Sequence, residues 1–140
     1  MSRPRDLDPG VTCSLVRNHG SEYRRVLAHG RADPRLLERI GTTHVIGAEV
    51  IHAVRAELAQ KLADVVYRRT DLGTGELPPP EALRTCAELM AAELGWTTER
   101  VESELVEVRA AFPRPIPEVA PHRAAWTPAA AAAPLAGTPL

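Results

Sequence analysis

The sequence predicts an all-α fold, a small helical bundle of about five helices, from three observations. Apolar residues recur at helical spacing, strand alternation is nearly absent, and capping residues and glycines separate the periodic segments. Residues 113–140 hold seven of the 13 prolines and nine alanines, so we expect a disordered Pro/Ala-rich tail there. Residues 1–10 are expected to be a flexible N-terminus, which leaves residues 11–112 as the helical domain.

The first part of this domain predicts three short helices. Residues 12–18 and 22–29 each carry a short apolar face, and Ser21 is the expected cap of the second helix. Asp33 is the expected cap of a third helix over residues 34–40, because a proline follows it at the first helical position and a glycine closes the segment.

An extended connector over residues 42–47 leads into the longest predicted helix, about 48–69. From Ile51 onward its apolar residues are spaced 3, 4, 4 and 3 apart, which places them on one face. Glu57 and Lys61 are expected to form an i, i+4 ion pair on the solvent side. The helix is expected to end in three polar residues, Arg68, Arg69 and Thr70.

Two further helices complete the predicted domain. Glycine and proline content makes residues 71–80 a loop, after which a helix over 80–94 is expected to end at a glycine. Thr97 or Thr98 is the expected cap of the last helix, which extends to about Phe112.

Composition restricts the partners and the setting. A net charge of −1 provides no basic field, so no nucleic acid is expected as a partner. Cys13 and Cys86 cannot form a disulfide framework, and a reduced compartment suits them. No apolar run approaches the ~20 residues of a membrane-spanning helix. We expect a cytoplasmic protein whose membrane association, if any, comes through a partner.

The residues predict no catalytic, cofactor or metal site. Gly73-Thr74-Gly75 resembles half of a phosphate-binding loop, but three prolines follow, so a flexible loop is favoured. None of the five histidines has recognised metal-ligand spacing, and His52 is expected to make a surface hydrogen bond beside Glu49. Cys86 falls on an apolar helix face and is expected in the core.

A helix-turn-helix is an alternative for residues 90–101, whose spacing fits that motif. The second helix carries four carboxylates against two arginines: Glu99, Glu102, Glu104 and Glu107 against Arg100 and Arg109. Carboxylates repel the phosphate backbone that such a helix must approach, so an ordinary helical corner is favoured.

Arg68 and Arg69 allow two interpretations. Cations in the last turn of a helix complement the negative end of its dipole, and this interpretation is favoured by helix physics alone. Alternatively, one arginine binds a carboxylate or phosphate of a partner bidentately.

Two long runs, AEVIHAVRAELAQKLADVVYRRTDLG and AELMAAELGWTTERVESELVEVRAAF, resemble a known domain. It is the C-terminal helical domain of FAD-dependent glycerol-3-phosphate dehydrogenases and the related alpha-glycerophosphate oxidases. The resemblance covers about residues 14–112 and includes an acidic-apolar entry, a helix ending in Arg-Arg-Thr and the Met90–Trp96 signature. The matching positions, interpreted as structural or interdomain residues, are Glu49, Arg68, Arg69, Thr70 and Trp96.

The resemblance implies a partner rather than a catalyst. In that family a large N-terminal domain binds FAD, oxidises glycerol 3-phosphate to dihydroxyacetone phosphate and passes electrons to quinone or oxygen. We therefore expect a detached or truncated C-terminal domain, with no cofactor of its own and no activity alone, that docks on an FAD-binding catalytic domain or subunit. The alternatives are a stand-alone helical interaction module and, less favoured, a helix-turn-helix DNA-binding protein.

Overall fold

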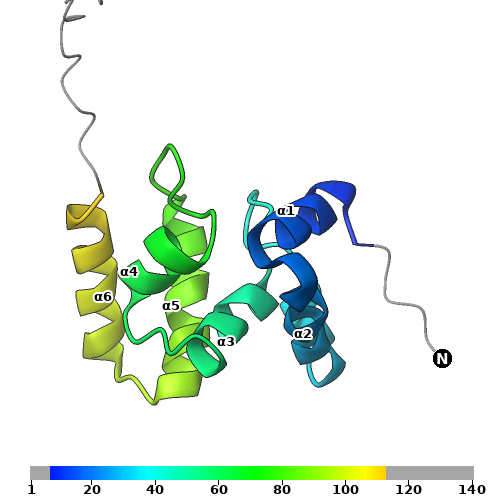
Figure 1. The fold of residues 1–140 in the computed structure, drawn as a ribbon. Helices are drawn as coiled ribbons and strands as arrows, with labels where there is room; N and C mark the ends of the chain where they lie inside the picture. Colours follow the sequence, from blue (N-terminus) through cyan, green and yellow to red (C-terminus); the bar gives the residue numbers. More distant parts are fainter. Residues whose placement is uncertain (1–6, 113–140) are drawn as a thin grey trace, which may run out of the picture.

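The structure, a computed structural model, describes residues 7–112 and is all-α, as predicted (Figure 1). The expectations for residues 1–6 and 113–140 lie outside the described residues. The helices are α1 (Pro9–His19), α2 (Tyr23–Ala28), α3 (Gly47–Arg55), α4 (Leu62–Asp64), α5 (Pro80–Leu94) and α6 (Thr98–Ala110). Shorter turns are η1 (Gly20–Glu22), η2 (His29–Arg31), η3 (Pro34–Leu37) and the π-helical η4 (Val65–Arg69).

The first two helices begin differently from the prediction. Asp8 Oδ1 accepts hydrogen bonds from two backbone N–H groups of the first turn, at 2.8 and 3.4 Å. This cap starts α1 at Pro9, inside the segment expected to be flexible. The predicted Ser21 cap is wrong, because Ser21 lies within η1 and α2 follows without a side-chain cap.

The predicted helix over residues 34–40 is too long. Asp33 does cap it by accepting the Arg35 N–H at 3.1 Å, but only the 3₁₀ turn η3 forms. The chain then folds back, and the Ile40 N–H donates to the Val45 carbonyl at 2.8 Å. This close pairing buries both side chains and prevents the helix from continuing.

The long helix predicted over residues 48–69 is wrong, because the chain breaks after Arg55. Leu58 adopts φ 59° and is 76% exposed, so it does not lie on the predicted apolar face. The chain re-enters helix only at α4 and continues through η4. The predicted pair of Glu57 and Lys61 is also wrong, since Lys61 Nζ lies 2.8 Å from Glu107 on α6.

Two carboxylates stabilise the break by capping the second helical segment, which begins at α4. Asp64 Oδ2 accepts the backbone N–H groups of Gln60 and Lys61 at 3.2 and 3.1 Å. Glu104 on α6 accepts the Leu62 N–H at 2.8 Å, inside the core. Helix starts leave N–H groups without intrahelical partners, and the bonds to Lys61 and Leu62 satisfy two of them. The cap from α6 comes from 42 residues away, where local periodicity has no influence.

The last two helices agree with the sequence prediction. Pro80 opens α5, and Gly95 ends it in the left-handed region at φ 68°. The Thr97 side chain accepts the Arg100 N–H at 3.2 Å and caps α6. An exposed bidentate pair of Arg55 and Glu93, with two 2.7 Å contacts, ties α3 to α5.

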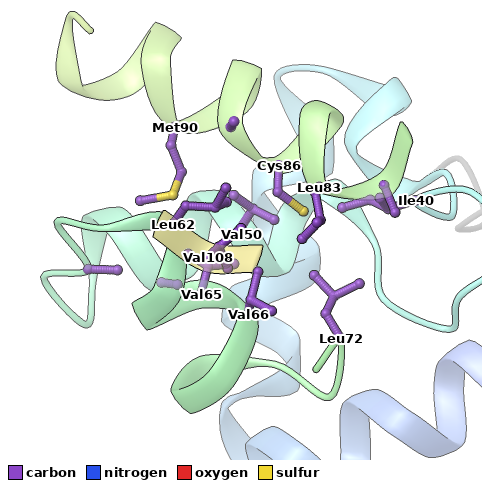
Figure 2. Packing of buried hydrophobic residues seen from close by; sticks show 14 of the residues in the cluster. Ile40, Val50, Leu62, Val65, Val66, Leu72, Leu83, Cys86, Met90 and Val108 are labelled. Carbon is purple, nitrogen blue, oxygen red and sulfur yellow. The ribbon is translucent and has the colours of Figure 1, made fainter. Parts of the chain in front are cut away.

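Two hydrophobic clusters share α3, which lies between the α1–α2 pair and the group of α4, α5 and α6 (Figure 1). The larger cluster joins α3, α4, η4, α5 and α6, and Figure 2 shows Leu83, Cys86 and Met90 of α5 among its side chains. The smaller cluster consists of five buried residues, Val11, Leu15, Val26, Ile46 and Ala48. Because Ala48 belongs to one cluster and Val50 to the other, the position of α3 sets both.

The break at Leu58 can be tested with Leu58→Gly. A left-handed conformation costs an L-residue about 1–2 kcal/mol, and glycine avoids most of this cost. Because the side chain is exposed, we expect the variant to gain about 0.5–1 kcal/mol in the free energy of unfolding measured with urea. Glu88→Gly, at an exposed site inside α5, is the control and should lose about 0.5–1 kcal/mol. A similar loss at Leu58 would mean that the helix is continuous.

The two cysteines should differ in reactivity. Cys13 is exposed, whereas Cys86 is fully buried and burial raises the pKa of its thiol to about 12. Thiolates are the reactive form, so we expect one fast-reacting thiol in the native protein and two after unfolding. A thiol–disulfide exchange assay with and without urea measures this, and Cys13→Ser should abolish the native signal. Fast native labelling of that variant would contradict the predicted core.

Candidate functional site

Glu49 is the most deeply placed of the predicted site residues. Its side chain is fully buried in the first turn of α3. Oε2 accepts the Ile46 backbone N–H at 2.9 Å, and Oε1 lies 3.0 Å from His19 Nε2 at the end of α1. Glu49 therefore caps α3 and connects it to α1.

Three histidines, His19, His29 and His52, lie together on the side of α3 that carries Glu49. The His52 ring lies edge-on to His19, with ring centroids 5.8 Å apart, and its Nδ1 lies 3.4 Å from His29 Nε2. The predicted surface hydrogen bond of His52 is wrong, because His52 is buried and Glu49 is engaged with His19 instead. The three rings come from α1, η2 and α3, which the fold brings together.

The pKa values of these rings differ in direction. The hydrogen bond to Glu49 raises the pKa of His19 above its ordinary value, although burial opposes it. Burial lowers the pKa values of His29 and His52. The environment therefore favours positive charge on the ring that faces Glu49 and neutral rings at the other two positions.

Arg68 and Arg69, the last two residues of η4, lie near different carboxylates. Arg68 NH1 lies 3.5 Å from Asp64, one helical turn earlier, and its side chain is 76% exposed. Arg69 Nε lies 3.9 Å from Glu57 Oε2 and its side chain is 44% exposed. Both distances are long for ion pairs, and exposed pairs of this kind contribute at most about 0.5 kcal/mol. Arg69 braces the turn after α3, whereas Arg68 remains accessible to a partner.

Thr70 ends the π-helical turn. Its backbone N–H and its hydroxyl both donate to the Val65 carbonyl, at 3.1 and 2.7 Å. The same hydroxyl accepts the Leu72 N–H at 3.3 Å, and the residue is nearly buried. Thr70 is therefore an internal scaffold residue.

Trp96 belongs to the corner between α5 and α6. Its backbone N–H donates to the Ala91 carbonyl at 3.1 Å and so closes the end of α5 after Gly95. The half-buried ring packs on the larger cluster, and the Arg100 guanidinium lies 5.7 Å from its centroid. The Arg100 guanidinium also forms an ion pair with the buried Glu104 carboxylate, so charged side chains of the domain itself stabilise this corner.

The glycine-containing segment after Thr70 is a loop, as predicted. Asp71 at its start accepts bonds from Arg17 and Asn18 of α1, at 2.7 and 2.9 Å. The loop, α1 and residues 42–45 border a hollow of about 270 Å³. Ser14, Arg17, Thr43 and Asp71 on its border make side-chain hydrogen bonds within the chain, and these bonds include no nucleophile–base pair.

The sequence interpretation did not identify His19, His29 or Glu104 as important. Glu104 had a usable signal, because it lies between Val101 and Val108 on the apolar face of α6. A carboxylate on such a face needs a buried partner. The two histidines had no comparable signal, since their approach to α3 depends on tertiary folding.

Together these groups can cap helices, join segments and accept a cation, and none forms a nucleophile–base–orienter arrangement within residues 7–112. The same residues include no helix with the length and hydrophobicity that a bilayer crossing requires. The five predicted site residues do not converge on one point, because Glu49 and Arg69 lie toward the histidines and Trp96 lies at the corner of α5 and α6.

The fold and these buried contacts define a compact helical domain. Residues 2–101 match the family model of the C-terminal domain of alpha-glycerophosphate oxidase. The chain belongs to this family, as the resemblance in its sequence predicted. No curated protein and no solved structure matches the chain.

The link between His19 and Glu49 can be tested by a double-mutant cycle with His19→Gln and Glu49→Gln. EDTA is added so that metal ions do not contribute to the stability measured. Disrupting a buried charged pair should cost about 2–4 kcal/mol in the free energy of unfolding, measured with urea. The two changes should couple by at least about 1 kcal/mol because the side chains are in contact.

Glu104→Gln is the matched control for this cycle. This change also removes a fully buried carboxylate, but one on α6 that caps the start of α4. Its effect on the free energy of unfolding should therefore add to that of His19→Gln within about 0.5 kcal/mol. Full additivity of the Glu49 and His19 changes would contradict the predicted link.

Proposed function

We propose that this chain serves as the helical C-terminal domain of an FAD-dependent glycerol-3-phosphate dehydrogenase or oxidase. It docks on an FAD-binding catalytic domain, in a separate subunit or in another part of the same protein. The parent reaction is the oxidation of glycerol 3-phosphate to dihydroxyacetone phosphate, with electrons passed to quinone or oxygen. In this proposal the helical domain is not catalytic alone.

The family match over residues 2–101 is the observation that carries this proposal. The use of the buried polar groups supports a scaffolding role, because Glu49, Thr70 and Glu104 each bond backbone N–H or carbonyl groups of the domain itself. Exposed apolar side chains provide candidate contact surface for a partner, namely Val16, Leu58, Leu77 and Val106.

The proposal is tested by mixing the purified chain with an alpha-glycerophosphate oxidase from which the C-terminal domain has been removed. The chain alone should be colourless and should not oxidise glycerol 3-phosphate in a dye-coupled assay. Calorimetry should show a saturable complex with the truncated flavoprotein. Bound FAD in the purified chain would refute the assignment of the cofactor to the partner, and lack of a complex would refute docking.

Arg68 is the predicted docking residue among the family positions, because its side chain is 76% exposed and held only by a 3.5 Å pair. Arg68→Glu should weaken the complex by about tenfold or more through charge reversal at a contact. Its unfolding free energy should change by less than about 0.5 kcal/mol.

Arg25→Glu is the control for this variant. The Arg25 side chain is also 76% exposed and also pairs with a carboxylate on a neighbouring turn, but it lies on α2. It should leave the affinity for the flavoprotein unchanged. Equal weakening by both variants would indicate a general charge effect and would contradict docking through Arg68.

A further inference from the structure

The side chains of His19, His52 and Glu57 converge from three segments of the fold. One possible ligand atom from each lies within 4.8 Å of the other two. His19 comes from the end of α1, His52 from α3, and Glu57 from the turn that follows α3. Two imidazoles and one carboxylate form a donor set that suits zinc and related divalent transition metals.

The two imidazoles are already oriented by outer partners. His19 Nε2 lies 3.0 Å from Glu49 Oε1, which leaves Nδ1 as its second ring nitrogen. His52 Nδ1 lies 3.4 Å from His29 Nε2, which leaves Nε2 as its second nitrogen. Metal-binding histidines commonly donate one ring N–H to a carboxylate or similar acceptor and bind the metal through the other nitrogen. His19 has this arrangement through Glu49, and His52 has it in the tautomer whose Nδ1–H donates to His29 Nε2.

The carboxylate of Glu57 provides an independent observation. Its Oε2 atom is buried and makes no hydrogen bond within the part of the chain that the structure describes. The nearest cation is Arg69, at 3.9 Å, which is beyond hydrogen-bond distance. Buried polar atoms nearly always have a partner, so an unsatisfied oxygen beside two imidazoles indicates an unfilled requirement for a cation.

We propose that His19, His52 and Glu57 bind one divalent transition-metal ion, with Zn²⁺ as the best fit. His19 Nδ1, His52 Nε2 and a Glu57 oxygen are the ligands, and Glu49 and His29 are the positioning residues. The fourth position of the tetrahedron is open to water. This proposal is independent of docking on a flavoprotein.

Ligand atoms of tetrahedral zinc lie about 3.3 Å apart for bonds of about 2.0 Å, so the cluster must contract by up to about 1.5 Å. The contraction falls on Glu57, because the rings are buried in packed elements and the turn carries the 76% exposed Leu58. The metal would join the end of α1 to α3 and to the start of the turn. Its role would be structural, since a bound metal stabilises the folded state that contains its site.

The test uses protein purified without a histidine tag and treated with EDTA. Titration calorimetry with Zn²⁺ should give one site per chain, and Zn²⁺ should raise the thermal midpoint. His52→Gln and Glu57→Gln should each weaken binding by at least about 100-fold, and His29→Gln by about 10–100-fold, as is typical of an outer partner. Bound Co²⁺ should give the strong visible absorption of a four- or five-coordinate ion.

His44→Gln and Glu76→Gln are the matched controls, since they remove the same side-chain types outside the cluster. They should bind Zn²⁺ as the parent does, and circular dichroism checks that every variant is folded. Glu57→Gln retains the fold most securely, because this side chain is 29% exposed. Binding of less than about 0.2 Zn²⁺ per chain, or full binding by folded Glu57→Gln and His52→Gln, would overturn the proposal.

Discussion

The buried Glu49 carboxylate is the interaction on which the rest of this fold depends. A charged group out of water is costly unless it is paired and hydrogen-bonded, and Glu49 meets this condition with His19 and the Ile46 N–H. Each of these bonds fixes a different element, α1 and the start of α3. Because α3 contributes to both hydrophobic clusters, a single carboxylate sets how the two halves of the domain meet.

Glu104 repeats this solution at a second helix start. It lies in the apolar face of α6 and accepts the Leu62 N–H that opens α4, while Arg100 balances its charge. The cap determines where α4 begins, and the π-helical turn and the Arg68-Arg69-Thr70 ending follow from that start. The Arg68-Arg69-Thr70 ending is therefore a product of tertiary contacts and not of a long continuous helix.

These contacts explain which parts of the fold could be predicted. The limits of α5 and α6 follow from local chemistry, namely Pro80, Gly95 and Thr97, and the sequence contains that information. The break after Arg55 depends on Glu104, and an apolar spacing of 3, 4, 4 and 3 fits one helix or two equally well. The grouping of His19, His29 and His52 was not visible for the same reason, because α1, η2 and α3 approach one another only in the folded chain.

The five positions suggested by the family resemblance fall into two groups. Four make contacts inside the domain, and one is largely exposed. Glu49 orients His19, Arg69 approaches Glu57, and both contacts border the proposed metal site. Thr70 and Trp96 complete backbone hydrogen bonds within the domain. These four residues maintain the fold, so a change at any of them would alter docking only indirectly. Arg68 alone among the five combines high exposure with a weak internal pair, which is why the docking proposal places direct contact with a partner there.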